Sequence, residues 1–327
     1  MERASGWQLL KRNRAALVAL WVLVGMVVLS LVGPPILVSI FGDSARGYSE
    51  YDFAPPGTVA APVDGERAQR YLFGTDISGR DLFYRVLMGA RVSLLVGLAG
   101  AAVSLVLGTV YGVVSGFCGG KIDAFMMRVV DILYSIPRLL FLMIFIAAFG
   151  KRFHDGLDGL RLAAQGRGWE DCAELLQALL PYSRIGLLIV ALGLIEWLVM
   201  ARIVRGQVLV LREMTFVKAA RALGQTPFGI VRRHLLPNLA TLILTYLTLT
   251  VPAVVLDESF LSFLGLGIEN PAASWGSLLR EGAEAWNVLD SHWWLLVFPA
   301  VFMSVTMLAF NFLGDGLRDA FDPKSSR

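Results

Sequence analysis

Long apolar blocks constrain this chain more than any other feature of its sequence. Four of them span residues 15–40, 93–117, 239–256 with its flanks, and 293–313. A helix needs about 20 apolar residues to cross the hydrocarbon core of a bilayer. Apolar residues make up 56% of the chain and charged residues 17%, against about 45–50% and 25% in soluble domains. The sequence therefore predicts an all-α membrane protein.

Two weaker blocks raise the predicted number of transmembrane helices to six. Residues 185–200 form a shorter apolar run that extends in both directions, and residues 132–149 combine an eleven-residue core, LLFLMIFIAAF, with the residues before it. Arg138 in the second of these would snorkel or face protein. The first block of the chain is too long for a signal peptide and lacks a cleavage site of small residues, so we expect a retained anchor.

The distribution of Lys and Arg predicts the orientation in the membrane. The N-terminus, residues 118–138, residues 201–238 and the C-terminal tail hold 4, 3, 7 and 3 of them, whereas residues 41–85, 150–184 and 263–292 on the opposite side hold 5, 5 and 1. Under the positive-inside rule, which weights short loops, both termini lie in the cytoplasm. With only five spans, the basic loops would lie on both faces of the membrane. This favours counting residues 132–149 as the third span.

Residues 201–238 form the most basic passage, with seven basic residues and one acid. Its run 216–223 favours a short helix that ends at Gly224, which suits a left-handed C-cap. Thr226-Pro227 favours the start of a second short helix, which Pro237 would end. This pattern predicts a compact knob with a surface of small alanines that docks on a soluble protein. The alternative is an orientation signal or a patch held against anionic lipid.

The same passage resembles the EAA loop of ABC-importer permeases, E-A-A-x3-G-x9-I-x-L-P. Lys218 stands in place of the glutamate and His234 in place of the isoleucine, so a role that needs a carboxylate at position 218 does not carry over. The resemblance implies a coupling helix that fits a cleft on an ATP-binding subunit. The coupling residues that it implies are Lys218, Ala219, Ala220, Arg221, Ala222, Leu223, Gly224, Thr226, Pro227, Phe228, Leu236 and Pro237.

Further motifs extend the resemblance to the dipeptide/oligopeptide permeases over about residues 70–323. Residues 73–81 resemble the GTD-x-x-GRD segment of that family, with Gly74, Thr75, Asp76, Gly79, Arg80 and Asp81 at the motif positions outside the membrane. Residues 89–94, 119–131, 201–207, 262–267 and 309–319 match other family segments. Residues 151–184 match none of them and are interpreted as an insertion. The glycines and carboxylates of residues 74–81 favour a structural elbow, and contact with a soluble binding protein is the alternative.

The resemblance implies the type I ABC-importer permease fold and the C-type subunit of a peptide importer in the cytoplasmic (inner) membrane. Residues 1–88 would hold the N-terminal tail, the first span and an outer loop, residues 89–316 the five-helix transmembrane domain with its coupling loop, and residues 317–327 a cytoplasmic tail. The implied partners are a second, B-type permease subunit, two ATP-binding subunits, an extracytoplasmic substrate-binding protein and membrane lipid. Neither a cofactor nor nucleic acid is expected.

The candidate catalytic motifs in this sequence are incomplete, which argues against an enzyme. Residues 116–121 resemble a phosphate loop only superficially, because Ser115 stands where the pattern needs glycine and Ile122 where Ser or Thr must bind magnesium. The three histidines are widely separated, so no metal site is expected. ATP hydrolysis is therefore expected on a separate subunit. A nickel or other small-solute importer of the same family and, more remotely, a secondary transporter are the alternative functions.

Three carboxylates lie in or at the end of apolar blocks, where charged groups face a bundle interior or an aqueous cavity. Glu196, Asp257 and Glu258 could line the substrate path and meet the ammonium group of a peptide. For Glu196 a structural pair with Arg202 or Arg205 is favoured, since both follow within two turns. For the other two carboxylates both interpretations stay open. Residues 169–180 are expected to form an amphipathic helix at the outer membrane interface.

Overall fold

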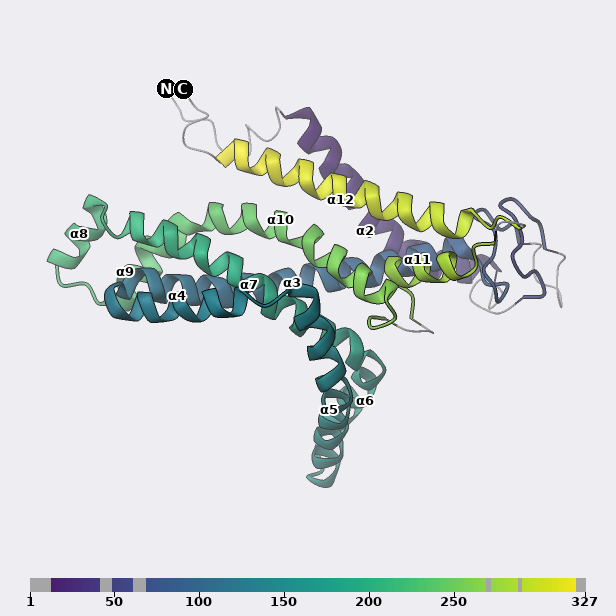
Figure 1. Cartoon of the computed structure of the whole chain (residues 1–327), viewed down its shortest axis with the longest axis horizontal. Coiled ribbons are helices and arrows are strands. Elements are labelled where there is room, and N and C mark those ends of the chain that lie inside the picture. The colour runs from purple at the N-terminus through teal and green to yellow at the C-terminus, as the bar shows by residue number, and fades with distance from the viewer. Residues whose placement is uncertain (1–12, 42–48, 61–68, 269–271, 288–289, 322–327) are drawn as a thin grey trace. The chain divides into compact units, whose positions relative to one another are not determined.

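A computed structural model describes residues 13–41, 49–60, 69–268, 272–287 and 290–321 (Figure 1). Helices are the only extended regular elements in this part of the chain. Residues 59 and 70, and residues 75 and 81, form isolated β-bridges. The prediction of an all-α protein is therefore confirmed.

Five helical segments are long and apolar enough to cross a membrane. They are α2 (Arg14–Phe41), α3 (Leu82–Cys118), α6 with α7 (Glu170–Leu179 and Ser183–Leu211, joined by the 3-10 turn Leu180–Tyr182), the continuous helix from α9 to α10 (Pro227–Phe263), and α12 (Trp294–Phe321). A sixth is present if α4 (Gly120–Tyr134) and α5 (Arg138–Gly166) are counted as one broken span. The protein is thus a multi-pass membrane protein.

The predicted weak span at 132–149 contains the break between α4 and α5. The two helices meet at an angle of 84°. Pro137 precedes the first residue of α5 with φ −55° and ψ 118°, and this ψ lies outside the helical region. The apolar core 139–149 therefore belongs to α5 alone, which continues to Gly166.

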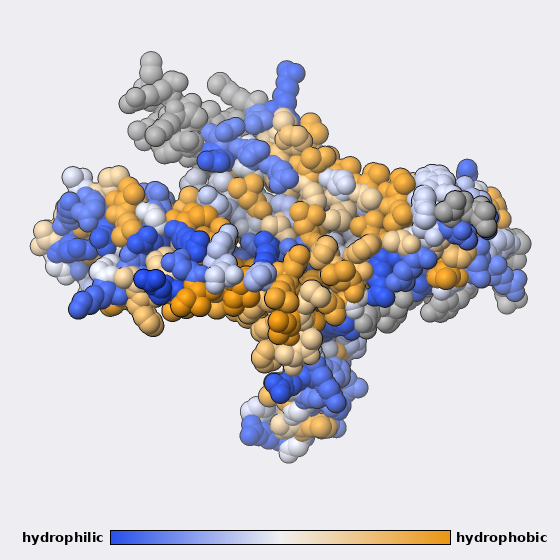
Figure 2. Space-filling model, in the orientation of Figure 1, coloured by the Kyte–Doolittle hydropathy of each residue, from blue (hydrophilic) through white to orange (hydrophobic). Residues whose placement is uncertain are grey.

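Residues 151–184, interpreted as an insertion, form most of a helical hairpin. Gly168 has φ 73°, and hydrogen bonds from its N–H to Gln165 O and from Trp169 N–H to Ala164 O close a Schellman turn. The expected helix at 169–180 is present as α6, which lies beside α5 (Figure 1). In Figure 2 the half of α5 next to α4 is apolar and the far end of the hairpin is mainly hydrophilic.

The chain divides into two compact units, which are described separately. Among the described residues, the first comprises residues 13, 97–254 and 314–321, and the second comprises residues 14–96 and 255–313. The core of the first unit joins α7 to the segment between α7 and α10. The core of the second joins the start of α3 to α11 (Trp275–Glu284) and the start of α12. The domain boundaries at 88 and 316 stay a prediction.

Candidate functional site

The segment between α7 and α10 begins with a helix and a glycine bend, as predicted. Helix α8 spans Thr215–Ala222. Gly224 has φ 78°, which glycine adopts without steric cost. Its N–H donates to Arg221 O and the N–H of Gln225 donates to Ala220 O, at 3.1 Å each. These two bonds define a Schellman C-cap, which gives α8 a fixed end.

The second short helix starts as predicted but does not end as predicted. The Thr226 side chain accepts a hydrogen bond from Gly229 N–H at 3.2 Å, with Pro227 in the first turn of α9 (Pro227–Ile230). However, the helix runs on through the π-helical turn Val231–Leu235 into α10 (Leu236–Phe263). Pro237 is therefore inside a continuous helix. Proline lacks an N–H donor, and a π-turn just before it is one way in which a helix accommodates the lost bond.

One face of this segment is buried against α7. Val217 and Ala220 of α8 are 0% and 5% exposed and belong to a cluster with Val204, Val208 and Leu211 of α7. Further members of the same cluster come from α3, α9, the π-turn and α10. The prediction that Ala220 lies on an outward docking surface is therefore not met, because its methyl group packs inside this chain. Packing on α7 holds the segment as a rigid extension of that helix.

The opposite face presents apolar side chains at the bend. Leu223 and Phe228, on either side of Gly224, are 84% and 71% exposed. The small residues Ala219 and Ala222 are also exposed, as are Lys218, Arg221, Thr226 and Pro227. Leu236 and Pro237, farther along the helix, are exposed as well. A large exposed apolar pair rimmed by basic residues is typical of a protein-binding surface.

Lys218, which replaces the motif glutamate, has a carboxylate partner nearby. Its Nζ lies 3.2 Å from Oε2 of Glu213, and Arg212 Nε lies 3.4 Å from Oε1 of the same residue. Lys218, with Arg212, lowers the pKa of Glu213 below its usual value. The pair is solvent-exposed, so its contribution to stability is small. Glu213 is the one acidic residue among the basic residues of passage 201–238.

Two ion pairs join α4 to α7. Arg205 donates from Nε and Nη2 to the two carboxylate oxygens of Asp123 at 2.8 and 2.5 Å, and Ser115 donates to the same carboxylate at 2.5 Å. Arg202 Nη2 donates to Asp131 Oδ1 at 2.9 Å. Residues 202 and 205 therefore lie on α7, where they bind α4. The expectation that one of them pairs with Glu196 is wrong.

Arg212 connects the end of α7 to the end of α3. Its Nη1 donates to Gly116 O at 3.0 Å, which satisfies a carbonyl at the C-terminus of α3. Gly119 has φ 67°, and a Cβ at this position would lie 2.4 Å from Arg212 Nη1. The GG of the family motif thus supplies a turn and makes room for this arginine.

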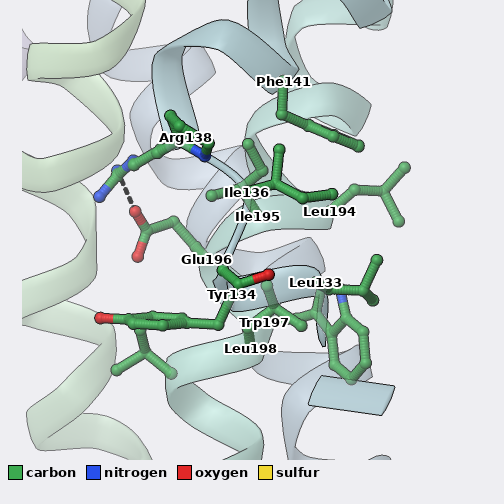
Figure 3. A pocket seen from close by; sticks show the side chains of 13 residues that line it. Leu133, Tyr134, Ile136, Arg138, Phe141, Leu194, Ile195, Glu196, Trp197 and Leu198 are labelled. Carbon is green, nitrogen blue, oxygen red and sulfur yellow. Dashed lines mark hydrogen bonds and ion pairs between the residues drawn. The ribbon is translucent and has the colours of Figure 1, made fainter. Parts of the chain in front are cut away.

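Glu196 pairs with Arg138 at the edge of an apolar pocket (Figure 3). The pocket has a volume of about 490 Å³ and is formed by the α4–α5 break, residues 133–141, and by residues 194–199 of α7. The Glu196 side chain is 9% exposed and the Arg138 side chain 40% exposed. The structural pair was predicted for Glu196, but its partner comes from α5 because the break brings the first turn of that helix to the middle of α7.

Glu258 is completely buried in the second unit. Its carboxylate accepts hydrogen bonds from the hydroxyls of Ser93, Ser262 and Ser259 at 3.0, 2.7 and 3.3 Å. A role for this residue in lining the path stays a prediction, as does a role for the partly exposed Asp257. The serine hydroxyls satisfy the carboxylate, as a buried polar group requires.

The motif at residues 73–81 forms an elbow before α3, organised by Asp76. Its Oδ1 accepts from the backbone N–H groups of Ser78 and Arg80 at 2.8 and 3.0 Å, and its Oδ2 accepts from the side chains of Arg80 and Arg85 at 2.7 Å each. Gly79 has φ 69° in the same turn. These bonds account for the motif residues as parts of a local structure, which supports the elbow interpretation.

The other motif positions are also engaged internally. Thr75 Oγ1 accepts from Ala54 N–H at 2.7 Å and donates to Tyr51 O, and the Thr75 carbonyl accepts from the indole N–H of Trp294 at 3.3 Å. Gly74 has φ 79° and is buried. Sequence analysis missed Glu281 of α11, whose Oε1 accepts from Arg85 Nη2 at 2.9 Å. These two residues lie 196 positions apart, and no motif marks the glutamate.

Comparisons with known proteins match nearly the whole chain. Residues 104–327 match the family model of the binding-protein-dependent transport system inner membrane component, and residues 4–56 match the N-terminal transmembrane domain of oligopeptide transport permease C. The dipeptide transport system permease protein DppC of Bacillus subtilis is 39% identical over 98% of this chain and 85% of its own length. The oligopeptide transport system permease protein OppC of Escherichia coli is 42% identical over 99% and 93%.

A solved structure supports the fold. A chain of the MetNI methionine ABC transporter, in an inward-facing conformation, superimposes with a TM-score of 0.51 over 73% of this chain and 97% of its own length. The two sequences are 19% identical, so the likeness concerns the fold alone. The helices of this chain are therefore arranged as in that chain of the methionine transporter.

Proposed function

Because this chain belongs to the family of binding-protein-dependent transport system inner membrane components, we propose that it forms half of the path of a peptide importer. The relatives named for dipeptide and oligopeptide transport support di- or oligopeptides as its substrates. An extracytoplasmic binding protein would deliver the peptide to this chain and to a related B-type permease subunit. Two separate ATP-binding subunits would supply the energy.

The surface around Leu223 and Phe228 carries the proposal of coupling. These apolar side chains project at a bend that is fixed by a Schellman cap and packed on α7. An ATP-binding subunit that accepts this pair in an apolar cleft would move α7 when it moves. Ion pairs from α7 to α4 would carry the motion onward to the α4–α5 break. Transport would follow by alternating access, with no ATP chemistry in this chain.

A single exposed residue gives a sharp test of the docking surface. We expect Leu223→Glu to abolish peptide uptake and peptide-stimulated ATP hydrolysis, because a carboxylate cannot be desolvated in an apolar cleft. Membrane insertion should be unchanged, since Leu223 is 84% exposed. Leu160→Glu is the matched control, because Leu160 is 60% exposed and lies on α5. The measurements are uptake in membrane vesicles and co-purification of the ATP-binding subunits. Normal uptake by Leu223→Glu would contradict the docking proposal.

The pocket beside the Arg138–Glu196 pair is the proposed place where a peptide passes this chain. A free peptide carries a terminal ammonium and a terminal carboxylate group. Its ammonium group can take the place of Arg138 beside Glu196, and its carboxylate can take the place of Glu196 beside Arg138. We expect Glu196→Gln to raise the peptide concentration needed for half-maximal uptake, because the ammonium group loses its partner. Glu174→Gln, which alters an exposed carboxylate of α6, is the control. If Glu196→Gln raises the concentration needed for half-maximal uptake of an N-acetylated peptide as much as that of a free peptide, this role is excluded.

A further inference from the structure

A second cavity lies between α5 and α7, apart from the Arg138–Glu196 pocket. Its volume is about 360 Å³, and it is lined by one face of α5 from Ile146 to His154 and by the first turns of α7 from Ser183 to Leu187. The imidazole Nδ1 of His154 lies 3.0 Å from Ser183 Oγ, so a hydrogen bond joins the two helices at the rim. The transport mechanism proposed above does not use this cavity.

The cavity is apolar at one end and basic at the other. Ile146 and Leu187, which are 5% and 2% exposed, form the apolar end. Lys151 of α5 and the partly buried Arg184 of α7 form the basic end. Gly150 between them has no side chain to fill the space, and a Cβ there would meet only Leu187 Cδ2, at 3.9 Å.

Both helices change character at the level of this cavity. On α5 the apolar run 139–149 gives way to Gly150, Lys151 and Arg152, and on α7 Arg184 is followed by the apolar run that starts at Ile185. Such a change marks the boundary between the hydrocarbon core and the headgroup region of a bilayer. The basic end therefore lies at the depth of lipid phosphates, and the apolar end lies at the depth of the acyl chains.

We propose that this cavity binds one anionic phospholipid, with its headgroup phosphate at Lys151 and Arg184 and its acyl chains over Ile146 and Leu187. Basic residues at a membrane surface attract anionic lipid, and the planar guanidinium of arginine binds phosphate oxygens in pairs. The apolar end selects a phospholipid over free phosphate, which has no group to place there. This proposal concerns α5 and α7 alone and does not depend on which solute the protein transports.

The test measures bound lipid directly. The transporter, purified with its partner subunits and depleted of lipid, is incubated with equal amounts of phosphatidylglycerol and phosphatidylcholine, and retained lipid is counted by native mass spectrometry. We expect wild type to retain phosphatidylglycerol in preference. The double variant Lys151→Gln/Arg184→Gln should lower that preference roughly thirtyfold, because each basic residue in contact with the bound headgroup contributes about fivefold.

Two further variants separate a built site from general surface charge. Arg152→Gln removes the same charge from the neighbouring exposed residue, which does not line the cavity, and should leave the preference unchanged. Gly150→Leu keeps both charges but fills the cavity, so it should release phosphatidylglycerol. The proposal fails if Arg152→Gln loses as much lipid as the double variant, or if Gly150→Leu retains it. It also fails if millimolar inorganic phosphate displaces the lipid, because that result would indicate a free-anion site.

Discussion

Among single residues, Asp81 has a pKa on which hydrogen bonding and burial act in opposite directions. Its Oδ1 accepts from Phe83 N–H at 2.8 Å at the start of α3, and its Oδ2 accepts from Gln69 Nε2 at 2.9 Å. Both bonds favour the ionised carboxylate, but burial outweighs them and raises its pKa from 3.8 to about 6. The folded protein therefore holds a proton on Asp81 more tightly than the unfolded chain does.

This raised pKa predicts how stability depends on pH. The contribution of Asp81 is fully present below pH 3.8 and is lost as pH rises through about 6. We expect Asp81→Asn to be more stable than wild type at pH 7.5, by on the order of 1–3 kcal/mol, because asparagine caps a helix equally well and carries no charge. The difference should vanish towards pH 4.

Thermal unfolding of the purified protein across this pH range provides the measurement. Asp171→Asn, which removes an exposed carboxylate from α6, controls for the change in net charge. Parallel curves for wild type and Asp81→Asn would show that Asp81 is not the titrating group.

At the scale of elements, the decisive feature is how α7 is joined to its neighbours. Its Asp123–Arg205 bond to α4 has two parallel contacts, and the Asp123 side chain is only 10% exposed. The second bond to α4, Asp131–Arg202, has one contact, and its side chains are 63% and 38% exposed. Geometry and burial both make the first pair the stronger connection.

A double-mutant cycle on each pair tests this ranking. We expect a coupling energy of about 1–3 kcal/mol between Asp123→Asn and Arg205→Gln, because each single change leaves a partly buried polar group without its partner. The cycle on Asp131→Asn and Arg202→Gln should give less than about 1 kcal/mol. Chemical unfolding in detergent micelles supplies the energies. Equal coupling in the two cycles would mean that α4 is not held mainly through Asp123.

At the scale of the whole molecule, the orientation in the membrane decides whether the proposed coupling is possible. Single cysteines at Leu223 and Leu160, which are both exposed, report on the two proposed sides when the exposed native Cys118 and Cys172 are replaced by serine. A membrane-impermeant maleimide should label Leu160→Cys in intact cells and Leu223→Cys only after permeabilisation. Labelling of Leu223→Cys from outside would exclude an encounter with a cytoplasmic ATPase.

The helical class, the membrane location and the local shape of the segment around Gly224 follow from patterns in the amino-acid sequence. These properties depend on the length of apolar runs and on backbone preferences, which act within one or two turns. Glycine at a positive φ and threonine at an N-cap are local in the same sense. The order of the family motifs also identified the family, which the comparisons confirm.

The pairing of charged groups depends on the packed fold, and the sequence did not predict it. Glu196 binds Arg138, Arg205 binds Asp123 and Arg85 binds Glu281, and these partners are far apart in the chain. In the packed fold, Ala220 also faces inward and the helix continues past Pro237. The physical reason is that helical periodicity defines the faces of a helix, whereas the neighbour on each face is set by how all the helices pack.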